Sequence, residues 1–245
     1  MTKAARVVAR PRNGETDMKI AIIGTGGVGA GLASVLAKTA HEITVSDRKG
    51  GTEASAKLAA RGLSVRAAEV RPAVQAADVV ILAVPDVILG DISRSVVPQM
   101  KTGAIVLTLD PAAAYAGLLA TRDDVVQAVA HPCHPSVFLE RTTKEEWADT
   151  FGGEGAPQNV VAAIDEDASA ETRAAAEATI KVIYAPVIDV HWVTVKQLAI
   201  LEPTLVETVA CMIGTLLNEA LYETVHTAGV PEAAAKAMLF GHVQI

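Results

Sequence analysis

A glycine-rich turn near the amino end constrains this chain more than any other feature. Residues 20–23 (IAII) are an apolar run of strand type, and G-x-G-x-x-G follows at Gly24, Gly26 and Gly29. A helical pattern begins directly behind the turn, and a second strand pattern ends at Asp47, about twenty residues on. This order of strand, glycine turn, helix and acidic strand end predicts a dinucleotide-binding βαβ unit.

Each position of the turn has a physical task in such a unit. Gly24 permits the tight turn, Gly26 lets the backbone approach a pyrophosphate, and Gly29 lets helix and strand pack closely. The free N–H groups of Gly27 and Val28, at the positive end of the helix dipole, are expected to receive the phosphates. A glycine-rich turn that holds no ligand is the plain structural alternative.

Asp47, at the end of EITVSD, indicates which dinucleotide is preferred. A carboxylate there accepts hydrogen bonds from the adenosine ribose and repels a 2′-phosphate, which favours NAD over NADP. Arg48 weakens this preference, since an arginine can stack on adenine or pair with a phosphate. Val84 and Pro85 end another apolar strand, and we expect them to contact the dinucleotide near its nicotinamide ribose unless they only close a turn.

Strand and helix patterns alternate along residues 18–190, and the strands are apolar throughout rather than at every second position. Such strands are buried on both faces, which indicates an α/β fold with a doubly wound, mainly parallel Rossmann sheet. The predicted strands are residues 18–23, 42–46, 65–67, 78–84, 104–109, 125–130, 159–164 and 185–189. The predicted helices are residues 28–40, 53–61, 73–77, 87–98 and 168–182, and a loop is expected at residues 152–157.

After Trp192 the pattern changes to an all-helical one. Residues 193–228 contain no strong helix breaker except Pro203 and Gly214, and apolar residues occupy nearly all faces. Such a helix would exceed about 50 Å, and one Rossmann-sized domain cannot surround it. We therefore predict a homodimer through the long helix. The expected division is a disordered extension at residues 1–17, an NAD-binding domain at 18–190, and a helical dimerisation and substrate domain at 191–245 that ends soon after its second helix begins.

Charge and cysteine usage restrict the partners and the compartment. The net charge is −7 with no block of like charges, which argues against nucleic acid as a partner. Two distant cysteines, Cys133 and Cys211, are no disulfide framework and fit a reducing compartment, so we expect a cytoplasmic protein. Glutamates interrupt the apolar stretch around residues 210–217, and we therefore expect no membrane span.

The segment AVAHPCHPSVF, residues 128–138, follows the predicted sixth strand. Ligands bind at the carboxyl ends of parallel strands, so His131, Cys133 and His134 should emerge near the reacting carbon. Histidine suits the uptake of a hydroxyl proton during hydride removal. Hydrogen bonding to the loop backbone is the alternative for either histidine. Packing is favoured over nucleophilic chemistry for Cys133, and the prolines weaken a metal-binding interpretation of H-x-x-H.

Three segments carry a resemblance to a known family: HPCHPSVF, QLAILEPTLVET at residues 197–208, and FGH near the end. With the glycine turn, they resemble the 6-phosphogluconate dehydrogenase-like superfamily of β-hydroxyacid dehydrogenases. Within it they are most similar to the group with a phosphogluconate dehydrogenase C-terminal domain that includes D-apionate oxidoisomerases. The resemblance implies NAD-dependent oxidation of a small hydroxy or sugar acid to a 2-oxo acid, followed by migration of the carboxylate. A divalent cation would assist such a shift.

The long helix supplies the remaining catalytic candidates. Glu202 precedes Pro203, which can kink the helix and aim this carboxylate into the cleft. Glu207 is five residues on, too far round for one α-helical face, and both glutamates could instead form salt bridges between helices. Lys196 matches the lysine that begins this helix in many relatives, but Ile200 stands where they have asparagine. Glu202 is therefore expected to replace part of that pair.

Two other functions remain open from the sequence. The first is a simple β-hydroxyacid or prephenate-type dehydrogenase, although an aromatic content of 3% offers no stacking platform for an aromatic substrate. The second belongs to another class, a dinucleotide-sensing protein without catalysis.

Overall fold

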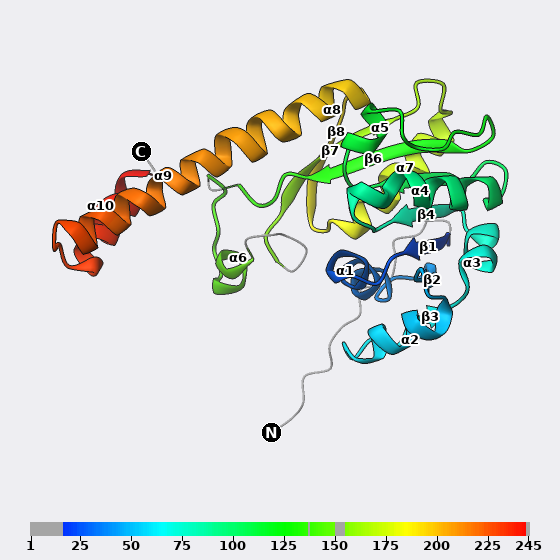
Figure 1. The fold of residues 1–245 in the computed structure, drawn as a ribbon, viewed down its shortest axis with the longest axis horizontal. Coiled ribbons are helices and arrows are strands. Elements are labelled where there is room, and N and C mark those ends of the chain that lie inside the picture. Colours follow the sequence, from blue (N-terminus) through cyan, green and yellow to red (C-terminus); the bar gives the residue numbers. More distant parts are fainter. Residues whose placement is uncertain (1–16, 137, 150–154, 244–245) are drawn as a thin grey trace.

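A single eight-stranded sheet organises the chain, with the order β3-β2-β1-β4-β5-β6-β7-β8 (Figure 1). This computed structural model describes residues 17–136, 138–149 and 155–243. The extension expected at residues 1–17 lies outside the described residues except for Asp17, as does part of the loop expected at 152–157. The strands are β1 (Lys19–Ile23), β2 (Glu42–Ser46), β3 (Arg66–Ala67), β4 (Val79–Leu82), β5 (Ile105–Thr108), β6 (Val126–Pro132), β7 (Gln158–Ile164) and β8 (Val187–Trp192).

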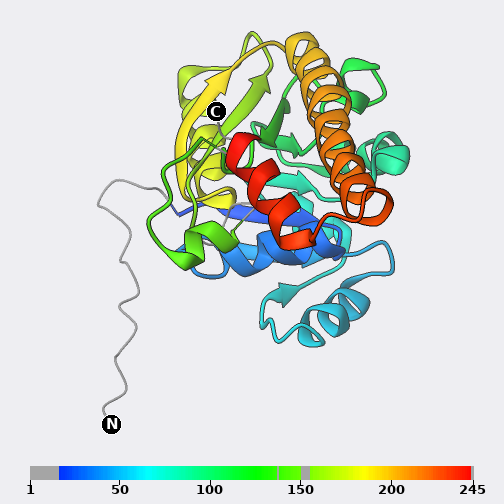
Figure 2. The same ribbon diagram turned by 90° about the vertical axis from the view of Figure 1, so that its left-hand side faces the viewer.

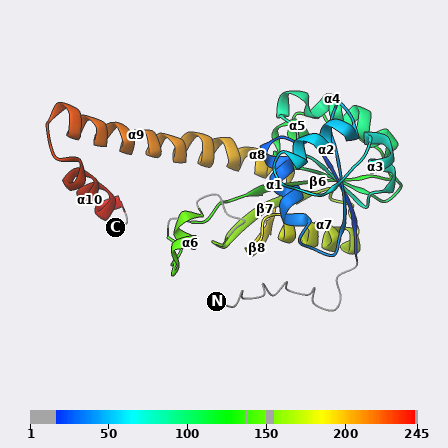
Figure 3. The same ribbon diagram turned by 90° about the horizontal axis from the view of Figure 1, so that it is seen from below.

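Helices cover both faces of this sheet, and Figure 3 shows α4 and α7 on opposite sides of the strands. Apolar residues alternate between the two sides: Ile20 and Ile22 pack in one cluster with residues of α1, α2 and α7, while Ala21 and Ile23 pack in another with residues of α3, α4 and α5. The doubly wound architecture is therefore confirmed. The helices of this part are α1 (Gly27–Leu36), α2 (Gly51–Ala59), α3 (Val70–Ala76), α4 (Asp86–Val96) with η1 (Val97–Gln99), α5 (Ala112–Tyr115), α6 (Lys144–Ala148) and α7 (Ala170–Ile183).

The last two strands, β7 and β8, are parallel to each other and run antiparallel to the first six. β7 pairs antiparallel with β6, and Pro132 at the end of β6 lies opposite Val160 near the start of β7. The connection between them, which contains α6, leaves and re-enters the sheet at the same edge. It therefore lies at the carboxyl ends of the parallel strands, where the segment after β6 was expected to contribute chemistry.

A helix extends away from the sheet domain, as Figures 1 and 3 show, and in Figure 2 it comes toward the viewer. It is continuous over Val195–Thr227 and consists of α8 (Val195–Leu201), the π-helical η2 (Glu202–Ala210), α9 (Cys211–Tyr222) and the π-helical η3 (Glu223–Thr227). The helix α10 (Glu232–Val243) follows. The predicted long helix is confirmed, but its two π-helical segments were not expected.

The long helix is apolar and uncovered in the single chain. Its most apolar 18-residue window has a hydropathy of 1.5, and none of that window is buried. By length and composition alone it could cross a bilayer, a criterion that the core helix of a soluble protein also meets. The expected absence of a membrane span therefore stays a prediction.

Two glycines of the turn hold strand, turn and helix together. A Cβ atom at Gly29 would lie 2.1 Å from the carbonyl oxygen of Gly24, and one at Gly24 would lie 2.2 Å from the carbonyl oxygen of Ala83. Gly24 also has a φ of +117°, a backbone conformation that residues other than glycine rarely adopt. The predicted tasks of a tight turn and close helix–strand packing are thus realised in the geometry.

We expect Gly29→Ala to destabilise the fold by about 2 kcal/mol or more, because the new methyl group must displace backbone rather than a flexible side chain. Gly31→Ala is the matched control in the same helix, since a Cβ there meets nothing within 4 Å. That control should be neutral or stabilising by up to about 1 kcal/mol through helix propensity. Thermal unfolding of both variants measures the difference, and equal stabilities would contradict the packing argument.

Candidate functional site

Two adjoining cavities lie at the carboxyl ends of β1 and β4, where the strand order reverses direction. Gly26, Val84 and Pro85 border both, so the two cavities form one groove along the glycine turn. The first, of about 400 Å³, is also lined by Asp47 and Arg48 and by apolar residues of α4. The second, of about 360 Å³, is lined by the residues Gly26, Gly27, Val28, Leu82, Ala83, Val84, Pro85, Asp86, Leu89, Leu109 and Asp110. The groove thus joins the tip of β2, at Asp47, to the end of β5, at Asp110.

The glycine turn leaves room for phosphates in the groove. A Cβ atom built on Gly26 or Gly27 meets no atom within 4 Å, so both face open space. Helix α1 begins at Gly27, and its first N–H groups therefore point toward this space. An anion there would meet backbone donors and the positive end of the helix dipole.

Asp47 sits at the tip of β2 and is tied to the turn. The Gly24 N–H donates to the Ser46 carbonyl oxygen at 2.8 Å, and the Thr25 hydroxyl donates to Asp47 Oδ2. Lys57 Nζ on α2 reaches the same oxygen at 3.0 Å. Burial alone would raise the pKa of Asp47, but the hydrogen bonds from Thr25 and Lys57 outweigh burial and hold the pKa below its usual value. Asp47 is thus a fixed anion at one end of the groove.

Carboxylates gather at the other end of the groove. Desolvation raises the pKa of Asp86, and the charges of Asp110 and Glu207 raise it further, while His131 opposes them. The pKa of Glu202 is also raised, first by desolvation and then by Asp110, Glu207 and Asp86. These four acids come from α4, the end of β5 and the long helix, and repel one another across a shared space. Asp86 and Glu202 therefore hold their protons to higher pH than isolated carboxyls do.

Glu202 and Glu207 meet because the helix is π-helical there. A π-helix bonds i to i+5, and the Thr208 hydroxyl donates to the Pro203 carbonyl oxygen at 2.8 Å across that spacing. The expectation that Glu207 lies too far round assumed α-helical periodicity, which this segment does not have, and the charge of Glu207 acts on Glu202. Pro203 lacks an N–H and so favours this widened turn. The neighbouring Leu205 is 54% exposed, so the surroundings of Glu202 in the single chain are acidic rather than apolar.

The segment after β6 lies beside the acidic end of the groove. His131 Nδ1 is 3.3 Å from the carbonyl oxygen of Leu109, whose only hydrogen-bonding role there is as an acceptor. Nδ1 therefore carries a proton, and in the neutral ring Nε2 holds the lone pair that a general base needs. His134 has a φ of +58°, a left-handed backbone that a non-glycine residue seldom adopts. Desolvation raises the pKa of the Cys133 thiol, which disfavours a nucleophilic thiolate, but the residue is exposed, so the expected packing role stays a prediction.

Lys196 is exposed in the first turn of α8, after the N-cap of Thr194. Four residues of the site gave no sequence signal: Thr25, Asp86 and Asp110, which line the groove, and Lys57, which pairs with Asp47. Asp86 and Asp110 directly follow predicted strands, so a search for acids at strand ends could have found them. Thr25 and Lys57 become recognisable only from their contacts with Asp47.

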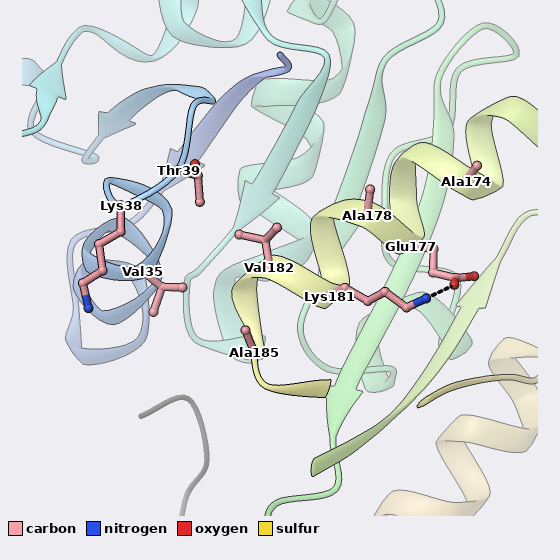
Figure 4. A pocket seen from close by; sticks show the side chains of 9 residues that line it. All are labelled: Val35, Lys38, Thr39, Ala174, Glu177, Ala178, Lys181, Val182 and Ala185. Carbon is pink, nitrogen blue, oxygen red and sulfur yellow. Dashed lines mark hydrogen bonds and ion pairs between the residues drawn. The ribbon is translucent and has the colours of Figure 1, made fainter. Parts of the chain in front are cut away.

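A different cavity, of about 650 Å³, lies between α1 and α7, away from the glycine turn (Figure 4). The ion pair of Lys181 with Glu177, at 2.6 Å, stands at its rim. The cavity is lined by Val35, Lys38, Thr39, Ala174, Glu177, Ala178, Lys181, Val182 and Ala185, and none of the predicted site residues is among them. The candidate site residues therefore point to the groove along the glycine turn and not to this cavity.

Comparison with known proteins agrees with this assignment. Residues 19–111 match the family described as NADP oxidoreductase, coenzyme F420-dependent, and residues 139–245 match the phosphogluconate dehydrogenase (decarboxylating) C-terminal family. A D-apionate oxidoisomerase of Pectobacterium atrosepticum is 57% identical over 92% of this chain and 78% of the relative. A D-apionate oxidoisomerase of Cupriavidus necator is 40% identical over 93% of this chain and 81% of the relative.

Solved structures show the same fold. A semialdehyde dehydrogenase NAD-binding protein of Cupriavidus necator, crystallised in complex with calcium and NAD, matches with a TM-score of 0.82 at 39% identity, covering 93% of this chain and 81% of that one. An NADH-preferring ketol-acid reductoisomerase from an uncultured archaeon matches with a TM-score of 0.67 at 19% identity, over 93% of this chain and 67% of that one, and supports the fold alone.

Fold, groove and relatives together define an oxidoreductase that uses a nicotinamide dinucleotide. More narrowly, the chain belongs to the D-apionate oxidoisomerase family.

We expect Asp110→Asn to stabilise the protein by about 0.5 kcal/mol at neutral pH, after allowance for solvent screening. The substitution removes one of the charges that raise the pKa values of Asp86 and Glu202, and it keeps the oxygen that accepts the Ala112 N–H at 2.8 Å. Repulsion requires ionised carboxyls, so the gain should vanish in acid, where these groups are protonated. Thermal unfolding against pH tests this, and a gain that persisted in acid would assign the effect to packing.

Proposed function

We propose that this protein is an NAD-dependent oxidoreductase that oxidises the CH–OH group of D-apionate or a close sugar acid and then rearranges its carbon skeleton. The observation that carries the proposal is the 57% identity, across 92% of the chain, to a relative named D-apionate oxidoisomerase. Independent support comes from the groove, which pairs a phosphate-binding turn with a proton-handling end.

NAD is the proposed cofactor. Asp47 stands where the adenosine ribose of a bound dinucleotide would lie, and its negative charge disfavours a 2′-phosphate. A relative at 39% identity was crystallised with NAD, which supports the same choice. Arg48 borders the same cavity, and we assign it to the face of the adenine. Val84 and Pro85 would support the ribose next to the nicotinamide.

Oxidation needs a base beside the reacting carbinol. As hydride leaves the substrate C2 for the nicotinamide, the C2 hydroxyl must lose its proton. His131 is the base we propose, because the Leu109 carbonyl oxygen fixes the proton on Nδ1 and leaves Nε2 ready to accept another. His134 is assigned to the substrate carboxylate or hydroxyls from the adjoining loop. The product of this step is a 2-oxo acid.

The skeletal shift needs a group that both takes and gives a proton. The C3 hydroxyl loses its proton, the bond from C3 to a hydroxymethyl carbon breaks as that carbon bonds to C2, and the former carbonyl oxygen at C2 gains a proton. The migrating group is thus the hydroxymethyl rather than the carboxylate expected from the resemblance, because such a shift moves a substituent from the carbinol carbon to the carbonyl carbon. Glu202 suits this exchange, since its pKa is raised. Lys196 is assigned to charge balance at the same end.

A divalent cation is implied by the resemblance, and a structural relative was crystallised with calcium. Carboxylate oxygens are suitable ligands for such an ion. Among the described residues, however, no group of three or more His, Cys, Asp or Glu side chains is arranged to hold a metal. The described carboxylates of one chain therefore do not form a ready ligand set, and a cation here would need further ligands from the substrate or from a second copy.

We further propose a homodimer joined through the long helix. Large apolar side chains are exposed along it, at 42–65%: Leu205, Val206, Val209, Met212, Ile213 and Leu216. Monomeric proteins rarely leave such a continuous patch in water, and a second copy would cover it. With a small-molecule substrate, acidic net charge and no nucleic-acid or membrane partner, the proposed setting is the cytoplasm.

We expect the purified protein to form NADH when incubated with NAD, D-apionate and Mg²⁺. Absorbance of NADH and analysis of the sugar acid product report oxidation and rearrangement separately. Omission of the metal is the paired condition, and it should slow the shift more than the oxidation. Simple 3-hydroxy acids serve as the comparison substrates.

The alternatives predict other outcomes of this incubation. Metal-independent turnover that is faster on simple 3-hydroxy acids would indicate a β-hydroxyacid dehydrogenase and contradict the oxidoisomerase. Dinucleotide binding without turnover of any hydroxy acid would indicate a sensor.

We expect His131→Ala, His134→Ala and Glu202→Gln each to lower turnover by about 100-fold or more, because each removes a proton-handling group. The Kd for NAD should stay within about twofold, since none of the three lines the phosphate turn or the ribose cavity. His41→Ala is the control: His41 Nδ1 accepts the Met18 N–H at 3.3 Å beside β1, where the chain enters the sheet. Full turnover in any one of these variants would contradict the catalytic role of that residue and indicate a structural one.

A further inference from the structure

Lys57, on α2, adds a positive charge beside the Asp47 carboxylate of the proposed cofactor site. Lys57 Nζ lies 3.0 Å from Asp47 Oδ2 and 3.5 Å from Glu53 Oε1. The Asp47 side chain is 12% exposed, whereas that of Lys57 is 43% exposed. Lys57 thus approaches the nearly buried carboxylate of Asp47 from the solvent side. The opposite face of that carboxylate is left to the groove.

The two oxygens of Asp47 are used unequally. Oδ2 accepts from both the Thr25 hydroxyl and Lys57, while Oδ1 receives one long contact, 3.4 Å from the Lys49 N–H. Oδ1 is therefore the oxygen with capacity for a ribose hydroxyl. Thr25 and Lys57 together fix the rotation of the carboxylate that presents it.

The same lysine changes how strongly the site rejects NADP. An unpaired aspartate repels a 2′-phosphate with its whole charge. Here a cation stands within one contact distance of the carboxylate, and Arg48 lines the same cavity. A positive charge beside a carboxylate weakens the repulsion that the carboxylate exerts on a nearby phosphate, and this effect is larger in a partly desolvated groove than in open water. The positive charge of Lys57 therefore offsets part of the penalty that Asp47 imposes.

We propose that Lys57 is a positioning and specificity-determining residue that orients Asp47 toward the ribose and moderates the discrimination between NAD and NADP. This rests on the proposed dinucleotide function and extends it. The charged groups that face Asp47 are the side chains of Lys57 and Arg48, with Glu53 beside the lysine. The site is consequently an NAD site with residual affinity for NADP, and Lys57 controls how much remains.

The test is the Kd of each dinucleotide, measured by fluorescence titration or calorimetry on the full chain. Lys57→Met should weaken NADP binding at least about fivefold more than NAD binding. Lys57→Arg should restore the ratio of the wild-type protein, since it keeps the charge. Because the effect is electrostatic, the difference should shrink as ionic strength rises.

Lys181→Met is the matched control, because Lys181 also pairs with a glutamate but beside the remote cavity of Figure 4. It should leave both Kd values unchanged. Equal weakening of NAD and NADP by Lys57→Met, or no change in either, would overturn the specificity role. A wild-type protein that binds neither dinucleotide would instead refute the proposed function, so the two failures are distinguishable.

Discussion

The close approach of Gly29 to the carbonyl of Gly24 is the contact on which the rest of the site depends. It places the first turn of α1 directly over the end of β1, with no side chain between them. The same turn donates from Gly24 to the tip of β2, so β1, β2 and α1 become one rigid corner. Asp47 and the open space before Gly26 then have fixed positions relative to each other. Backbone packing therefore shapes the place for a dinucleotide, and the side chains add to a site that the backbone has already formed.

The acidic end of the groove has the opposite physical character. There the structure gathers like charges that repel one another, and the raised pKa values of Asp86 and Glu202 record that cost. Proteins keep such arrangements mainly where function uses them. A groove with a strongly ionised carboxylate at one end and easily protonated carboxyls at the other separates recognition of the nucleotide from the transfer of protons.

Patterns in the sequence predicted those features of the fold and the site that depend on residues close together along the chain. The glycine spacing, the apolar strands and the strand ending at Asp47 sufficed for the doubly wound fold, and the segment after β6 was correctly placed at the carboxyl edge. Three features escaped because they depend on geometry between distant segments. β7 runs antiparallel since its connection returns at one edge, Glu207 joins Glu202 through a π-helical turn, and Lys57 meets Asp47 only after α2 folds back. No spacing rule along the chain encodes these contacts.

The long helix links assembly to chemistry. Glu202 lies where this helix leaves the sheet domain, and the exposed apolar side chains from Leu205 to Leu216 continue along the same helix. A rigid helix transmits a displacement of one end to the other, so whatever covers the apolar stretch also restrains Glu202. If a second copy covers it, as we propose, dimer formation would dehydrate this side of the groove and strengthen the interactions among its carboxyls. The uncovered helix and the mutually repelling carboxyls would then both be features of a single chain, whose site becomes complete only in the dimer.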